Sequence, residues 1–303
     1  ISSAVNNFFD PKNQHTVKVL PFLGEYSWSV VIASLVLAFC VAAVLIGGVK
    51  RIASVSQIIV PFMAVIYIVF VLVLVVCNIT AVPAAFATIV KAAFSPKAIT
   101  GGAVGSFLVA MQKGVARGIF SNEAGLGSAP IAAAAAQTKE PVRQGLVSMT
   151  GTFIDTIVIC TLTGLSIVLT GAWQVDGLEG VQVTTYAFQN GLPLPKELSA
   201  FVLMLCLVFF AFTTILGWDY YSERCLEYLS GGRMKYVKVY RWIYILAVFI
   251  GPYMTVSAVW TIADIFNGLM ALPNMIALFA LSGVVVKETK HFFERHRNGE
   301  IED

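Results

Sequence analysis

The sequence predicts an all-α, polytopic membrane protein, and its composition, its apolar runs and one glycine-broken segment carry that prediction. Of the 303 residues, 58% are hydrophobic and only 12% are charged, and the mean hydropathy is +0.82. Soluble globular domains carry about 25% charged residues, so this chain is too apolar for that class. The net charge of +3 is small and gives no indication of a nucleic-acid partner.

Seven segments of this chain are apolar over roughly 20 residues, the length that crosses the hydrocarbon core of a bilayer. We therefore predict seven transmembrane segments, one of them broken. With an odd number of crossings, the two ends of the chain lie on opposite sides of the membrane. The predicted segments are residues 27–47, 54–76, 103–136, 148–170, 199–229, 239–259 and 262–286.

The distribution of lysine and arginine predicts the orientation of these segments. Most of these residues fall on one set of alternating connections and on the C-terminal tail 287–303, and five fall on the other set. Cytoplasmic loops are enriched in lysine and arginine, so we expect a cytoplasmic tail and an N-terminus of this chain outside. The five residues on the outer side are Lys12, Lys18, Lys91, Lys97 and Lys196.

Two outer connections have patterns of their own. Residues 82–94 place Phe86, Ile89 and Phe94 on one helical face, which predicts a short amphipathic helix in the membrane interface, with an ordinary loop as the alternative. Residues 171–197 are rich in glycine and proline. We expect a loop there that serves as a lid or as a simple link.

The sequence lacks the usual catalytic and zinc-binding patterns. All three histidines lie outside the predicted spans, and the five cysteines show neither C-x-x-C spacing nor a cluster with histidine. A serine or cysteine nucleophile needs a base within hydrogen-bond reach. We therefore expect no enzyme, no catalytic residues, no cofactor and no zinc site.

The segment 114–136 combines membrane-like hydrophobicity with a polar, glycine-rich centre. Each glycine weakens a helix by about 1 kcal/mol relative to alanine, and four of them occur between Gly114 and Gly127. We predict two half-helices joined by unwound backbone, with Ser128 capping the second half and Pro130 in its first turn. Such backbone is tolerated at membrane depth only where it is buried in protein or lines a cavity. The segment therefore predicts a site for an ion or a small molecule, and a kink held by neighbouring helices is the alternative.

Ionisable residues inside the apolar segments are costly unless they are paired or hydrated. Arg117 and Glu123 flank the predicted break, where they either lock the broken helix or contact a ligand. Asp155 lies in a polar stripe with Thr152, Thr156 and Thr163. This stripe either makes helix-to-helix hydrogen bonds or lines a pathway for water or ions.

A second polar point lies in the predicted span 199–229. The adjacent hydroxyls of Thr213 and Thr214, with the carbonyl of Phe210 one turn earlier, supply oxygen ligands of the kind that hard cations such as sodium take. Trp218 lies one turn beyond Thr214 on the same face. The alternative is a pair of threonines bonded to their own helix beside a packing tryptophan.

The run from Gly114 to Pro130, GVARGIFSNEAGLGSAP, closely resembles the sodium:alanine (alanine or glycine:cation) symporter family. The resemblance covers nearly the whole chain and is more specific than any single motif. Further runs that resemble the family are GG at 47–48, KRI at 50–52, PFM at 61–63, PVRQG at 141–145, FIDT at 153–156, CTLT at 160–163, FTTILGW at 212–218 and PN at 273–274.

The resemblance implies the leucine-transporter fold, in which two inverted five-helix repeats hold the substrate between broken helices. The spans of this chain would then be core helices four to ten, with the broken segment as the sixth and 199–229 as the eighth. By that analogy the sodium ligands are Phe210, Thr213 and Thr214. The amino-acid pocket is lined by Trp218 and by the stretch that contains Phe120, Ser121, Asn122 and Gly125.

The family carries further helices before the first span seen here, including the other broken helix. We therefore expect residues 1–303 to form a single integral membrane transporter domain that is an N-terminally truncated, C-terminal portion, and to transport nothing alone. The implied function is sodium-coupled symport of alanine or glycine across the plasma membrane, in bacteria the inner membrane. The alternatives are proton coupling through Asp155 or Glu123, a passive channel and a non-transporting scaffold.

Overall fold

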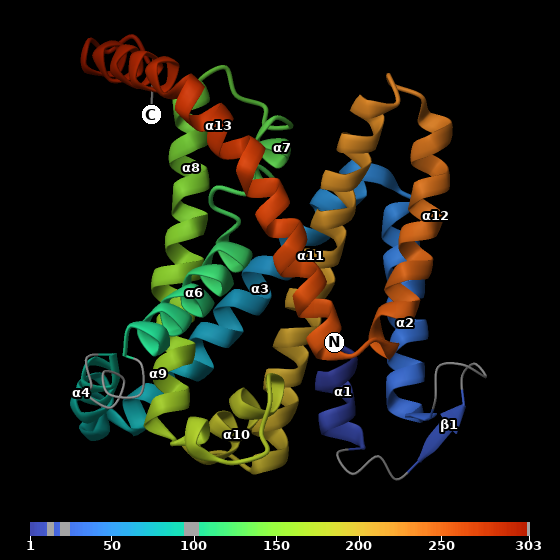
Figure 1. Cartoon of the computed structure of the whole chain (residues 1–303), viewed down its shortest axis with the longest axis vertical. Coiled ribbons are helices and arrows are strands. Elements are labelled where there is room, and N and C mark those ends of the chain that lie inside the picture. The colour runs from blue at the N-terminus through green and yellow to red at the C-terminus, as the bar shows by residue number, and fades with distance from the viewer. Residues whose placement is uncertain (11–14, 19–24, 94–102, 302–303) are drawn as a thin grey trace. The chain divides into compact units, whose positions relative to one another are not determined.

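The computed structural model describes residues 1–10, 15–18, 25–93 and 103–301 of the chain (Figure 1). Lys12, Phe94 and Lys97, which entered the predictions above, lie outside these ranges. The chain divides into two compact units, each described by itself. Unit 1 contains Ile1–Lys91 and Leu162–Thr255, and unit 2 contains Ala92–Thr161 and Val256–Asp303.

Among its described residues, unit 1 is helical apart from one pair of antiparallel strands, β1 (Thr16–Lys18) and β2 (Glu25–Ser27). Local signals explain several helix starts: Ser27 accepts a hydrogen bond from the Ser29 amide ahead of α2, and Pro195 precedes α11. The helices are α1 (Ser2–Phe9), α2 (Trp28–Leu45), α3 (Gly48–Cys77), η1 (Ile79–Ala81), α4 (Val82–Ala93), α9 (Thr161–Leu169), η3 (Ala172–Gln174), α10 (Val181–Gly191), α11 (Lys196–Leu229), α12 (Met234–Ile250) and η4 (Gly251–Tyr253).

The core of unit 1 lies along α11, which packs against α3 on one side and against α2 and α12 on the other (Figure 1). One buried cluster joins α3, α10 and α11, and a second joins α2 to Leu216 of α11. The long helix α11 is therefore the element on which this unit is assembled. The first cluster contains Val71, Leu74, Phe188, Leu192 and Leu203, and the second contains Val41, Val44, Leu45 and Leu216.

The two connections with patterns of their own are both helical. The predicted helix at 82–94 is confirmed as α4, whose Phe86 and Ile89 are exposed. The prediction of a loop at 171–197 is wrong, because this stretch contains α10. Phe188 of α10 is fully buried in the cluster with Leu74. This burial stabilises the helix, although the glycines that flank it favour a loop.

Unit 2 contains α6 (Ala103–Asn122), α7 (Ala129–Ala133), α8 (Pro141–Phe153), the π-helix η2 (Ile154–Cys160) and α13 (Val256–Arg297). Helix α8 begins with Pro141, whose missing amide hydrogen is no loss at a first helical position. The far end of α13 is fastened to the start of α8, since Arg295 Nη2 lies 3.1 Å from Glu140 Oε1. The predicted tail 287–303 continues α13 as a helix up to Arg297.

Five helices in the described part of the chain are long and apolar enough to cross a membrane: Trp28–Leu45, Gly48–Cys77, Pro141–Leu169, Lys196–Leu229 and Ser257–Arg297. They coincide with five of the seven predicted spans. The other two remain predictions: α12 has 17 residues, and the segment 103–136 is interrupted. Large apolar side chains such as Phe39, Ile276 and Phe279 are 71–75% exposed, as expected for surfaces that face lipid rather than water.

Candidate functional site

The polypeptide leaves the helical state between α6, which ends at Asn122, and α7, which begins at Ala129. Glu123, Gly125 and Gly127 all have positive φ, at 57°, 83° and 84°. Glycine adopts this region without strain, whereas a glutamate there is uncommon. The predicted break is confirmed, and it lies at residues 123–128.

Three details of the break differ from the prediction. Gly114 and Gly118 lie inside the continuous helix α6, and α7 is only five residues long. Pro130 lies in the first turn of α7 as predicted, but Ser128 caps no amide through its side chain. Its hydroxyl instead donates to Glu123 Oε2 at 2.7 Å, so the two ends of the break are joined through their side chains.

Arg117 and Glu123 have different partners. The Arg117 guanidinium donates from Nη1 and Nη2 to the two carboxylate oxygens of Asp264 on α13, each at 3.0 Å. Its Cζ also lies 3.9 Å from the centre of the Trp260 ring. Glu123 holds the break through Ser128. The locking role left open in the sequence is thus divided, with Arg117 tying α6 to α13 and Glu123 closing the loop.

The end of α6 is fastened to the π-helix η2. Ser121 Oγ lies 2.9 and 2.8 Å from the two carboxylate oxygens of Asp155, and Asn122 Nδ2 donates to Thr156 Oγ1 at 2.9 Å. Asn122 also accepts from the amide of Ala124, which helps to hold the unwound backbone. Asp155 therefore makes the helix-to-helix contact that was one of its two predicted roles. π-Helical turns often occur at functional sites.

Helix α13 contacts both α6 and the break, and the sequence analysis did not identify its residues as part of the site. The ring of Phe120 meets Trp260 edge to face at 5.3 Å, and the Gly125 carbonyl accepts from Asn274 Nδ2 at 3.0 Å. Asp264, Trp260 and Asn274 recur at helical spacing and so share one broad face. That periodicity was the available signal for their common role.

The predicted sodium ligands lie together on α11 in unit 1. The hydroxyls of Thr213 and Thr214 donate to the Phe210 carbonyl at 3.0 and 2.9 Å. Thr213 also contacts the Phe209 carbonyl at 3.1 Å. The threonines are therefore bonded to their own helix, as in the alternative that the sequence left open. The same bonds nevertheless gather the three expected oxygens at one point.

Trp218 is half-buried one turn beyond Thr214 and packs edge-on against Tyr221, with ring centres 5.7 Å apart. Trp218 and the threonine pair belong to unit 1, whereas the break, Arg117 and Asp155 belong to unit 2. Each unit thus carries its own part of the predicted site.

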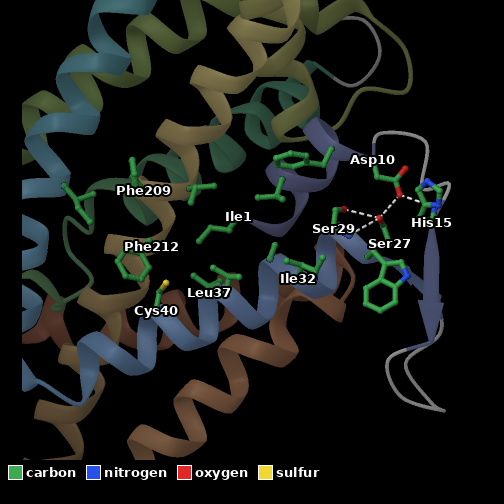
Figure 2. A pocket seen from close by; sticks show the side chains of 17 residues that line it. Ile1, Asp10, His15, Ser27, Ser29, Ile32, Leu37, Cys40, Phe209 and Phe212 are labelled. Atoms are coloured by element: carbon green, nitrogen blue, oxygen red, sulfur yellow. Dashed lines mark hydrogen bonds between the residues drawn. The ribbon is translucent and has the colours of Figure 1, made fainter.

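A large open cavity in unit 1 is lined by none of these residues (Figure 2). Its volume is about 650 Å³, and α1, α2 and α11 line it with side chains such as Ile32, Leu37, Phe209 and Phe212. Polar groups occur at one end, where Ser27 Oγ donates to Asp10 Oδ2 at 2.7 Å. The neighbouring α11 residues Phe210, Thr213 and Thr214 are absent from its lining. Such an apolar wall suits lipid or a packed helix better than a small zwitterion.

Comparison with known proteins places this chain in a family. Residues 7–303 match the model of the sodium:alanine symporter family. The chain belongs to that family. The sequence resemblance is thereby confirmed, and the family is one of symporters rather than enzymes.

Individual symporters and transporters show the same relationship. An uncharacterized transporter of Haemophilus influenzae is 54% identical over 88% of this chain and 58% of its own length. The sodium/alanine symporter AgcS of Methanococcus maripaludis is 49% identical over the same shares. The amino-acid carrier protein AlsT of Bacillus subtilis is 37% identical over 91% of this chain and 57% of its own length. The chain therefore spans less than two thirds of the length of these curated relatives.

Proposed function

We propose that this chain forms the C-terminal portion of a secondary transporter in the plasma membrane that couples sodium entry to uptake of alanine or glycine. The observation that carries the proposal is the non-helical backbone at residues 123–128, within a segment expected at membrane depth. Backbone in that state exposes amides and carbonyls that a polar solute can satisfy. Membership of the sodium:alanine symporter family supports the choice of solutes.

The amino-acid pocket in this proposal is built around the end of α6. The C-terminal end of a helix carries a partial negative charge, which favours the ammonium group of an amino acid. Ser121 and Asn122 add hydroxyl and amide groups, and the ring of Phe120 adds an apolar wall. Gly125 leaves the backbone open to close approach, since nothing lies within 4 Å of the position a Cβ would take. Trp218 would limit the volume of the pocket.

The sodium site in this proposal is the group of three oxygens on α11. Hard cations prefer oxygen ligands and take several of them, and this group offers three, since the hydroxyls of Thr213 and Thr214 both bond the Phe210 carbonyl. The remaining ligands would come from helices that precede this chain in the complete protein. Sodium and amino acid would then favour the same conformation, and each would tighten the binding of the other by an equal factor.

Proton coupling is the second candidate, and the contact of Asp155 with Ser121 at the break favours it. Two relatives have names that include both ions. The putative sodium/proton-dependent alanine carrier protein YrbD of Bacillus subtilis is 37% identical over 84% of this chain, and the sodium/proton-dependent alanine carrier protein of Bacillus sp. PS3 is 34% identical over 84%. A carboxylate that bonds the substrate segment is a natural proton acceptor in such a cycle.

The experiment that tests the proposal is uptake of radiolabelled alanine and glycine into vesicles that hold the complete gene product. Sodium is replaced by choline at fixed pH, in the wild type and in Thr213→Ala plus Thr214→Ala. We expect concentrative uptake to fail both without sodium and in the double variant. Thr88→Ala is the matched control, because its hydroxyl also bonds its own helix, at the Ala84 carbonyl. Sodium-independent uptake that follows a pH gradient would replace sodium with the proton, and non-saturable flux would indicate a channel.

A further inference from the structure

Asp219 is a fully buried carboxyl group that the proposed transport cycle does not use. It lies on α11 with 0% of its surface exposed. Neither of its carboxylate oxygens has a hydrogen-bond partner in the described part of the chain. Buried polar groups in proteins are nearly always hydrogen-bonded, so this side chain calls for a physical explanation.

The neighbouring ion pair does not supply the missing partner. Glu223, one turn further along α11, is 3% exposed and receives two hydrogen bonds from Arg241, at 2.6 and 2.9 Å. Both of its carboxylate oxygens thus engage the guanidinium. The hydroxyl of Tyr244 donates to the Ile215 carbonyl at 2.8 Å. The carboxyl groups of Asp219 and Glu223 thus share one neighbouring cation, Arg241.

The other elements packed on α11 bring no second cation to Asp219. The α12 groups that interact electrostatically with it are the guanidinium of Arg241 and the phenols of Tyr240 and Tyr244. Helices α1, α2 and α10 contain no charged side chain. The charged residues of α3 are Lys50 and Arg51, and both are exposed.

An ionised Asp219 would therefore leave one uncompensated negative charge in a buried site, which costs several kcal/mol. A sodium ion is a poor remedy, because hard cations take several oxygen ligands and both carboxylate oxygens of Glu223 already bond the Arg241 guanidinium. A single proton neutralises the carboxyl without further ligands. We propose that Asp219 is a proton-binding site on α11, occupied in the conformation described here and emptied when α11 and α12 separate or water reaches the carboxyl.

This site would connect proton binding to the helix that carries the proposed sodium ligands. Asp219 follows Thr214 by five residues on the same continuous α-helix. The connection to transport rests on the proposed function, whereas the presence of the proton does not. The two ideas can therefore fail separately.

The first test is infrared spectroscopy of the complete protein in detergent at neutral pH. We expect a carbonyl-stretch band of a protonated carboxylic acid that disappears in Asp219→Asn. Asp176→Asn, at an exposed position of the same unit, should leave the band intact. An unchanged band in Asp219→Asn would overturn the proposal. A band that appears only when sodium is replaced by choline would also overturn it, in favour of a cation site.

The second test compares the midpoints of thermal unfolding at neutral pH. Asn resembles a protonated Asp, so Asp219→Asn should shift the midpoint far less than Glu223→Gln, which leaves Arg241 uncompensated. Equal losses in both variants would mean that Asp219 is an ionised partner of Arg241 and would overturn the proposal. If Asp219→Asn does not fold, Asp219→Glu serves instead, and it should retain a protonated-acid band at a shifted frequency. The absence of that band in the folded Glu variant would count against the site.

Uptake measurements then separate this site from the transport proposal. We expect Asp219→Asn to keep sodium-dependent uptake and to flatten its dependence on pH relative to Asp176→Asn. Sodium-independent uptake by the wild type would refute the proposed function but would not affect the infrared result. A pH profile in Asp219→Asn that matches the wild type would refute the link between this proton and transport.

Discussion

Arg117 and Asp264 meet through two parallel hydrogen bonds of 3.0 Å each, with the guanidinium lying against the ring of Trp260. The two side chains are 34% and 38% exposed. This pair joins the helix that precedes the break to the helix that faces it, and paired hydrogen bonds fix orientation as well as distance. This charged pair thus positions α6 against α13 together with the edge-to-face contact between Phe120 and Trp260.

A double-mutant cycle on Arg117→Gln and Asp264→Asn should give a coupling energy of about 1–3 kcal/mol in unfolding experiments on the complete protein, since contacting residues in one network are not additive. The control is the pair Arg224 and Glu227, which lies on one helix and should couple by less than about 1 kcal/mol. Equal coupling in the two pairs would show that the contact with Asp264 contributes nothing special.

Alanine substitutions at three glycines should separate the break from the helix before it. Gly127→Ala combines a positive φ of 84° with a Cβ 3.2 Å from Asn274, and Gly125→Ala carries only the strain of its φ of 83°. Left-handed backbone costs about 1–2 kcal/mol in alanine. We expect alanine uptake to fall most in Gly127→Ala, less in Gly125→Ala and not at all in the control Gly118→Ala, which lies in α6 with open space.

Equal uptake by the Gly125 and Gly127 variants would mean that Asn274 does not constrain the loop. A loss in Gly118→Ala as large as that in Gly127→Ala would contradict the placement of the break at residues 123–128.

Trp218→Ala in the complete protein should admit larger amino acids, because the indole ring is the largest side chain near the threonine pair. Uptake competition by leucine and methionine measures the change, which we expect to be at least about tenfold in relative affinity, since one methylene is worth about 1–3 kcal/mol in an apolar pocket. The control Trp242→Ala removes an indole that is 63% exposed on α12. Unchanged selectivity in Trp218→Ala would remove this residue from the pocket.

Asp155→Asn should retain sodium-dependent uptake with weaker amino-acid affinity, because the amide oxygen still accepts from Ser121 while the charge is lost. Uptake is measured against a sodium gradient and against a pH gradient in separate vesicles. Ser121→Ala removes the same contact from the other side and keeps the carboxylate, so it serves as the comparison. Loss of all gradient-driven uptake in Asp155→Asn alone would favour the proton as the coupling ion.

The sequence was sufficient for features that have a local chemical cause. Glycines and a polar triplet predicted the break, and five of the seven segments predicted from apolar run length coincide with helices long and apolar enough to cross a membrane. The same reasoning failed at α10 and at Ser128. In both cases a partner that the local pattern does not indicate determines the structure. Phe188 is buried in one cluster with Leu74 of α3, and the Ser128 hydroxyl bonds the carboxylate of Glu123, a residue with positive φ.

The composition of the site required pairing information that a single sequence does not carry. Arg117 and Asp264 are separated by 147 residues, and so nothing local identifies them as partners. The π-helix could not be predicted from the sequence either, because residues 154–160 have the composition of an ordinary apolar α-helix. The fold of two inverted repeats and the sodium ligands stay predictions that rest on the family.

The π-helix η2 divides the polar stripe of the run 141–169 between two partners. Asp155 and Thr156 bond Ser121 and Asn122 of α6, whereas the Thr163 hydroxyl lies 2.5 Å from that of Tyr67 on α3. A π-turn is wider than an α-turn, and it shifts the direction of every side chain that follows it. Rewinding η2 into an α-helix would therefore change the direction in which the Thr163 hydroxyl projects from its helix relative to the Asp155 carboxylate.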